Sequence, residues 1–77
     1  MNNKRRAHIL KNAVPLLDRV FDIVSNVCDA EQDALDNIPE NLQSSSRYEN
    51  IEETISFLED AMDDIEGAIS NLQEAIK

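Results

Sequence analysis

The sequence is poor in the residues that build disulfides, metal centres and sheets. Its 77 residues include one cysteine, one histidine, one glycine, two prolines and no tryptophan. A single cysteine cannot form a disulfide within the chain, and Cys28 with His8 falls short of the ligand set of a zinc site. We therefore expect a fold that is stabilised by packing alone, with no metal and no cofactor.

Long apolar runs are also missing. The longest stretch without a polar residue is Ala13 to Leu17, five residues, whereas a membrane helix needs roughly 20. The basic start is like that of a signal peptide, but Lys11, Asn12 and Asp18 interrupt the stretch that follows it. These absences, with a lone thiol that suits a reducing compartment, predict a soluble cytoplasmic protein.

The apolar residues that are present have a helical rhythm. Hydrophobic residues make up 42% of the chain, which argues against disorder despite a net charge of −9. In the C-terminal half they alternate four and three residues apart without a gap: Ile51, Ile55, Leu58, Met62, Ile65, Ile69, Leu72 and Ile76. Ser46 and Glu49 fit a capping box at the start of this stripe. The pattern predicts a helix over about residues 47–77.

The N-terminal half carries two apolar stripes. The first consists of Leu10, Val14, Leu17, Phe21, Val24, Cys28, Glu31, Leu35 and Ile38, in which Glu31 is the polar member. The second consists of Ala13, Leu16, Val20, Ile23, Val27, Ala30 and Ala34, and it lies about 100° around the helix from the first. We predict a first helix over about residues 4–37 that is kinked or broken near Pro15, either as one bent helix or with Asn12 as a new N-cap.

Between the two helical patterns lies a connection over residues 38–46. Pro39 disfavours helical geometry at Ile38, and the serines that follow are turn and cap formers. A short connection between amphipathic helices favours antiparallel neighbours, with paired residue numbers summing to about 85. The expected fold is a single all-α domain, an antiparallel helical hairpin with the possibility of a short extra N-terminal helix before Pro15.

The second stripe of the first helix has no partner within such a hairpin. Burying Leu16, Val20, Ile23 and Val27 is worth roughly 6–12 kcal/mol. We therefore predict that Leu16, Val20, Ile23, Val27 and Ala30 form an interface, and that the chain assembles into a dimer or higher oligomer, a helical bundle. The same stripe also fits a different helical protein as its partner.

Charge is divided between the two ends of the sequence. Lys4, Arg5, Arg6 and His8 cluster at the start, and these residue types suit a small phosphorylated ligand. The remainder is strongly acidic, which disfavours duplex nucleic acid and favours either a solvated face or a basic partner. Acidic Glu59, Asp60, Asp63 and Asp64 lack the loop geometry of a metal site, and we expect no catalytic residues.

The segment from Glu31 to Gln43, followed by Ser46, Arg47 and Glu49, resembles small acidic helical proteins of phages and mobile elements in Gram-positive bacteria. Those proteins show an E-Q-x-x-x-D-N-x-P-x-x-L-Q turn, then S-x-R-x-E and an acidic amphipathic helix, and the resemblance covers about residues 29–77. It implies an accessory role in a host cytoplasm, and it brings no known activity or functional residues. In shape the expected hairpin also resembles an RNA-binding plasmid copy-number regulator that is a dimer of hairpins.

These observations predict a non-enzymatic, self-associating helical binding protein that acts stoichiometrically on a host factor, for example as an inhibitor of a host defence system. Two alternatives remain open. One is an oligomer that sequesters a small phosphorylated or nucleotide signal through Lys4, Arg5, Arg6 and His8. The other is a purely structural or assembly role.

Overall fold

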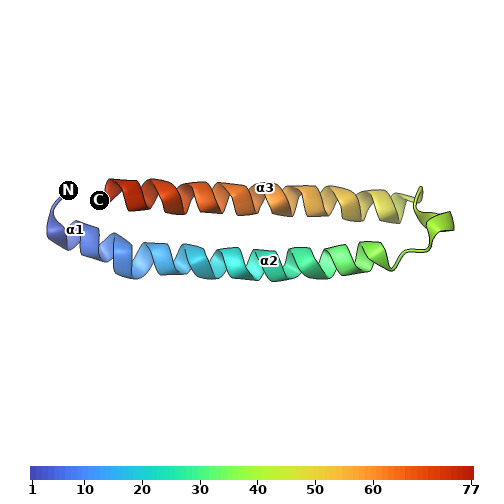
Figure 1. Ribbon diagram of the computed structural model, residues 1–77, viewed down its shortest axis with the longest axis horizontal. Helices are drawn as coiled ribbons and strands as arrows, with labels where there is room; N and C mark the ends of the chain where they lie inside the picture. The colour runs from blue at the N-terminus through green and yellow to red at the C-terminus, as the bar shows by residue number, and fades with distance from the viewer.

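The computed structural model describes residues 1–77 as two long helices lying side by side (Figure 1). The first is built from α1 (Asn3–His8), a π-helical turn (Ile9–Ala13) and α2 (Val14–Asp36), 34 residues without a break. The second is α3 (Ser46–Ala75). The structure contains no strand, which confirms the all-α prediction. Both termini lie at one end of a rod 59 Å long, and the connection lies at the other.

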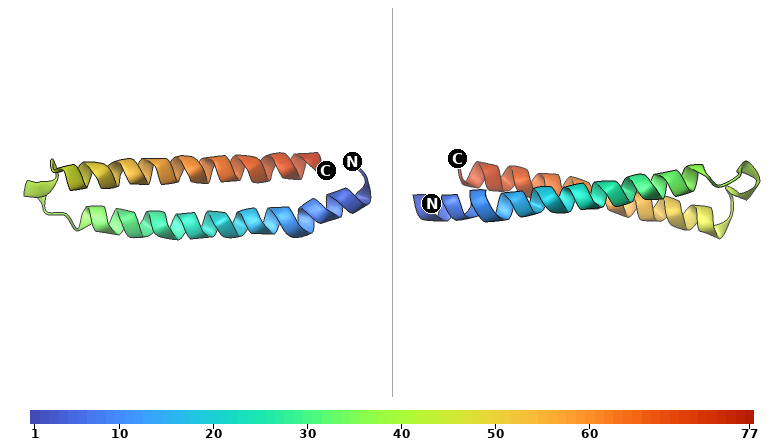
Figure 2. Two further views of the ribbon diagram at one scale, coloured as in Figure 1. Left: turned by 180° about the vertical axis from the view of Figure 1, so that it is seen from behind. Right: turned by 90° about the horizontal axis from the view of Figure 1, so that it is seen from below.

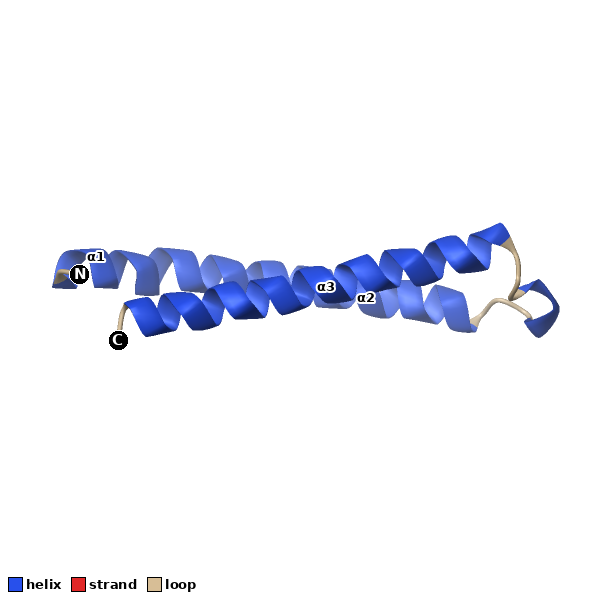
Figure 3. Cartoon of the chain, turned by 90° about the horizontal axis from the view of Figure 1, so that it is seen from above, coloured by secondary structure: helices blue, strands red, loops and turns tan.

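The two helices are paired along most of their length and cross at a shallow angle (Figures 2 and 3). The two helices contact each other through the heptad stripes predicted from the sequence, and we call these stripes the seams. The three buried residues of the chain all belong to them: Val14 and Leu35 in α2, and Ile55 in α3. The remaining seam residues of α3 are half-buried. No side chain in the chain is fully enclosed, because two helices can cover only one line of each other.

The first helix bends near its N-terminal end without a break, as the ribbon shows (Figure 2). Pro15 has no amide hydrogen, and it lies in the first turn of α2 just after the π-helical turn. There the Val14 N–H donates to the Ile9 carbonyl, five residues back. The alternative with Asn12 as an N-cap is wrong, because the Asn12 side-chain amide instead donates backward to the His8 carbonyl (3.0 Å).

The π-helical turn holds one residue more than an α-helical turn, so the residues before it are rotated about the helix axis. Ile9 therefore takes the seam position that the heptad pattern assigned to Leu10, and it is half-buried. Leu10 is turned outward and is 55% exposed. Its assignment to the first stripe is thus wrong, and the cause is the extra residue.

The connection between the helices is short and ordered by local hydrogen bonds. Asp36 ends α2, Glu40–Leu42 form a 3-10 turn, and the Leu42 N–H donates to the Pro39 carbonyl (2.8 Å). At the start of α3 the N-cap is Ser45, whose hydroxyl accepts a hydrogen bond from the Tyr48 N–H (3.3 Å). The predicted capping box at Ser46 is wrong by one residue, because Ser45 is the last residue with extended backbone.

The two adjacent serines give a matched test of this cap. We expect Ser45→Ala to lower the free energy of unfolding by about 1 kcal/mol, since one amide at the start of α3 loses its acceptor. Ser46→Ala, inside the first turn, should change it by less than about 0.5 kcal/mol. Urea denaturation followed by circular dichroism at one fixed protein concentration measures both. A larger loss for Ser46→Ala would place the cap where the sequence pattern put it.

Candidate functional site

The largest exposed apolar feature of the chain is the second stripe of α2. Leu16 is 63% exposed and Ile23 is 52% exposed, and Val20 and Val27 are exposed to a similar degree. Ala30 is exposed as well. These are the residues that the sequence predicted as an interface, and in the hairpin nothing covers them. They follow one another at heptad spacing, so they form a continuous line about 100° from the seam.

A second helix contributes to the same side of the hairpin. In each helix, the residues one position before the seam residues form one flank of the seam. Since α2 and α3 run in opposite directions, these two flanks lie on the same side of the hairpin. In α3 that flank carries Phe57, which is 66% exposed, with Ala61, Ala68 and Ala75, and the exposed polar residues Thr54, Asp64 and Asn71 lie between them. We call this set, together with Leu16, Val20, Ile23, Val27 and Ala30, the apolar face. It combines large side chains on α2 with mostly small ones on α3.

The other side of the hairpin is acidic. There the residues one position after the seam residues include no basic side chain before Lys77. Nine of them are carboxylates: Asp18, Asp22, Asp29, Asp36, Glu49, Glu52, Glu59, Asp63 and Glu66. The structure contains one ion pair, Lys77 with Glu74 (3.2 Å), and it lies on the surface near the end of α3. No three acidic, histidine or cysteine side chains converge in a way that could hold a metal ion. The two sides of the hairpin thus differ sharply in chemistry.

Cys28 is a half-buried residue of the α2 seam. Partial burial raises the pKa of its thiol above the ordinary value, and the negative charges of Glu59 and then Asp29 raise it further. Glu59 belongs to α3, and its effect on Cys28 in α2 agrees with the expected register, in which paired residue numbers sum to about 85. A thiol with a raised pKa is mostly protonated and is a poor nucleophile near neutral pH.

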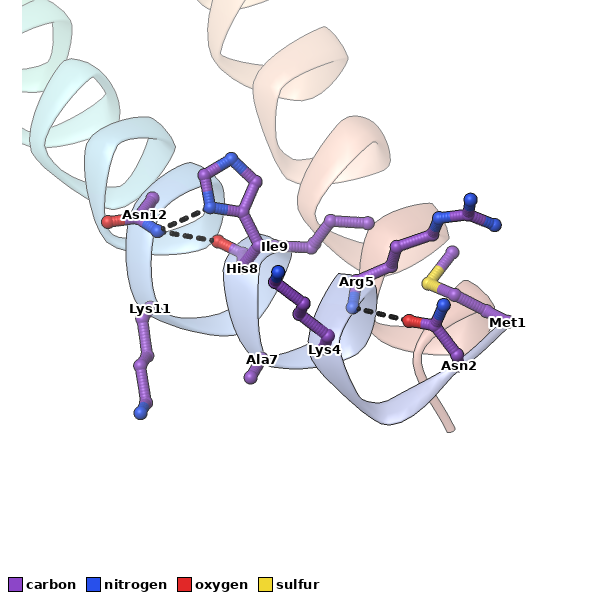
Figure 4. A pocket seen from close by; sticks show the side chains of 9 residues that line it. All are labelled: Met1, Asn2, Lys4, Arg5, Ala7, His8, Ile9, Lys11 and Asn12. Carbon is purple, nitrogen blue, oxygen red and sulfur yellow. Dashed lines mark hydrogen bonds between the residues drawn. The ribbon is translucent and has the colours of Figure 1, made fainter.

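The basic cluster at the start of the chain borders an open hollow of about 840 Å³ on α1 and the π-helical turn (Figure 4). Lys4, Arg5, His8 and Lys11 contribute to its lining, with Met1, Asn2, Ala7, Ile9 and Asn12. Two hydrogen bonds shape the backbone there: Asn2 Oδ1 accepts from the Arg5 N–H (2.8 Å), and Asn12 Nδ2 lies 2.9 Å from His8 Nδ1. In Figure 4 the side chains of Arg5 and Lys11 point away from each other, so the hollow is a shallow basic surface.

Of the four predicted ligand-binding residues, the structure brings three to the hollow and separates the fourth. Lys4, Arg5 and His8 line it, and Arg6 does not. Arg6 is half-buried, its Nη1 donates to Asn3 Oδ1 (3.2 Å), and its buried Nε has no hydrogen-bond partner. Sequence reasoning missed Lys11 because it lies a full turn beyond the cluster. The spacing of Lys4, His8 and Lys11, four and three residues, was the signal that would have found it.

Sequence reasoning also gave Phe57 too little weight, since it was one member of a thin stripe on the second helix.

Comparison of the chain with known protein families, with curated proteins and with solved structures gives no match. Neither long helix has a segment apolar enough to cross a membrane. The site is therefore defined by geometry and charge alone.

The pKa of Cys28 gives a test of how the two helices are registered. Replacing Glu59 by Gln removes the negative charge across the seam, so the thiol pKa should fall toward its ordinary value. Alkylation by iodoacetamide at fixed pH should then become faster, and its pH profile should shift to lower pH. Glu66→Gln, one heptad further along the same flank, should leave both unchanged. Equal acceleration by the two variants would show that Glu59 has no special place beside Cys28.

Proposed function

We propose that this protein is a non-enzymatic, self-associating helical binding protein that works by stoichiometric contact. The observation that carries the proposal is the apolar face. Large side chains that a folded protein normally buries are between 43% and 63% exposed along α2, and Phe57 extends the same surface on α3. An apolar surface of this kind, bordered by polar residues, is typical of a site where another protein docks.

The size of the molecule supports the same proposal. A compact chain of 8.7 kDa exposes about 4,700 Å², whereas this chain exposes 5763 Å². Its radius of gyration is 17.5 Å, against about 11.5 Å for a compact chain of this length. The excess surface, about 1,000 Å², is close to what one partner contributes to an ordinary protein interface. A second chain of the same kind on the apolar face would remove it.

The acidic side and the resemblance to phage and mobile-element proteins extend the proposal to a biological setting. We propose that the assembled protein is an accessory protein that acts in the cytoplasm of a bacterial host. There it engages a host factor, for example a component of a defence system, in fixed proportion. No group of side chains in the hairpin converges on an enclosed cavity, which supports action by binding over action by catalysis.

Substitution on the apolar face tests self-association. We expect the wild-type protein at micromolar concentration to have a mass of at least two chains by light scattering, and Ile23→Asp to reduce it to one chain. A carboxylate on the apolar face would have to be buried without a partner, which costs several kcal/mol. Asn26→Asp adds the same charge to an exposed position of α2 outside this face and should leave the mass unchanged. A wild-type protein of one-chain mass would refute self-association.

The basic hollow favours a second function, the sequestration of a small phosphorylated ligand. Lys4, Arg5, His8 and Lys11 line it together, and no carboxylate of the chain forms an ion pair with any of them. Charged side chains without an internal partner are free to bind an anion.

The neighbouring arginines give a matched pair for this second function. In calorimetric titration with inorganic pyrophosphate we expect Arg5→Ala to weaken binding about tenfold, the loss of one charge-assisted hydrogen bond. Arg6→Ala should have little effect, because Arg6 lies outside the hollow. If wild-type protein gives no heat of binding, or if both variants behave alike, the hollow does not act as this anion site. Loss of pyrophosphate binding with intact oligomers would separate this function from self-association.

A further inference from the structure

The apolar face and the uneven distribution of charge along the rod together define how a second copy would pack. If two copies bury the same face against each other, two closed two-fold arrangements exist. With the two-fold axis along the rod, α2 of one copy lies over α3 of the other, and both connections lie at the same end. With the axis across the rod, α2 lies over the partner's α2, and the connections lie at opposite ends.

The two ends of the rod carry opposite charge. Residues 1–12, at the end where the termini lie, hold four basic side chains and no acidic one, namely Lys4, Arg5, Arg6 and Lys11. Residues 29–53, at the connection end, hold eight acidic side chains and one basic one. The acids are Asp29, Glu31, Asp33, Asp36, Glu40, Glu49, Glu52 and Glu53, and the base is Arg47. None of these charges takes part in an ion pair within the chain.

The π-helical turn directs part of the basic end toward the apolar face. Its extra residue rotates the preceding turn, so that Ile9 lies on the seam and Arg5 and His8 lie on the flank that continues the line of Leu16 and Val20. A second copy on the apolar face would therefore lie beside the Arg5 guanidinium. Like charges brought together at an interface are unfavourable, and opposite charges fix its register.

From these observations we propose that two copies of the chain pack through the apolar face with their connections at opposite ends, α2 against α2 and α3 against α3. This inference rests on the proposed self-association and specifies its geometry. The basic end of each copy then lies beside the acidic connection of its partner. In the other arrangement the two basic ends lie side by side, and so do the two acidic ends.

The pairing of α3 with α3 also suits the side chains of the apolar face. Ala61, Ala68 and Ala75 recur every seven residues, and alanines allow two helices to approach to about 8 Å, the lower limit of helix packing. Leu16, Val20, Ile23 and Val27 then pack against the same residues of the partner's α2. The pairing thus brings the large side chains of the two α2 helices together, while α3 contributes mainly alanines, with Phe57 and Asp64 between or beside them.

Distances between spin labels distinguish the two arrangements. In a Cys28→Ala chain whose mass is first shown to equal that of the wild type, Ser44→Cys places one label on each connection. Pulsed electron spin resonance should give a separation of about 50 Å for connections at opposite ends, and about 20 Å for connections at one end. A label at Asn26→Cys, near the middle of α2, should give less than about 35 Å in either arrangement.

A long Ser44 distance with a short Asn26 distance supports the proposed packing. Short distances at both positions overturn it while leaving self-association intact, as does a mass of three chains by light scattering. If neither label gives a distance and the mass is that of one chain, the proposed function itself fails.

Discussion

The antiparallel pairing of two heptad seams is the constraint on which the rest of this structure depends. Two helices can bury only one line of side chains each, so even the seam residues remain half-buried and Val14, Leu35 and Ile55 alone are largely enclosed. A scaffold of this size has little stability to spare. The second stripe of α2 therefore has two physical roles at once: it is a cost to the isolated hairpin, and it is a surface whose burial would stabilise an assembly.

The same pairing gives the hairpin two unlike sides. Because the helices are antiparallel, equivalent flanks of the two seams fall together. In α2 the sequence places apolar residues on one flank and carboxylates on the other, and in α3 the first flank alternates Phe57 and alanines with Thr54, Asp64 and Asn71 while the second is acidic. The nine unpaired carboxylates repel one another and any second copy that approaches from their side. In the proposed assembly, association is thus directed to the apolar face by exclusion as well as by attraction. The one surface ion pair, Lys77 with Glu74, contributes little to either effect.

Heptad periodicity predicted the helical fold and the exposed stripe, because both follow from where apolar residues recur. The position of Ile9, the cap at Ser45 and the separation of Arg6 from Arg5 could not be predicted in this way. The position of Ile9 and the inward direction of Arg6 depend on the extra residue of the π-helical turn, and the cap depends on which serine keeps an extended backbone. Pro15 signalled a disturbance, but periodicity does not distinguish a break from a π-helical turn, and only the latter rotates Leu10 outward and Ile9 onto the seam. At the start of α3, three consecutive serines offered three possible caps, and backbone geometry selects among them.

The basic end would link the proposed assembly to the proposed ligand binding, because its cations have two possible partners. If the connection of a second copy lies beside Lys4 and Arg5, its carboxylates neutralise them, and an anion must displace those carboxylates before it binds. If instead two basic ends lay together, a bound anion would relieve their repulsion and stabilise the assembly. The two cases differ in the sign of the coupling between anion binding and self-association, and that coupling is reciprocal. In the proposed assembly, the orientation of the second copy on the apolar face therefore determines whether the basic hollow competes with assembly or cooperates with it.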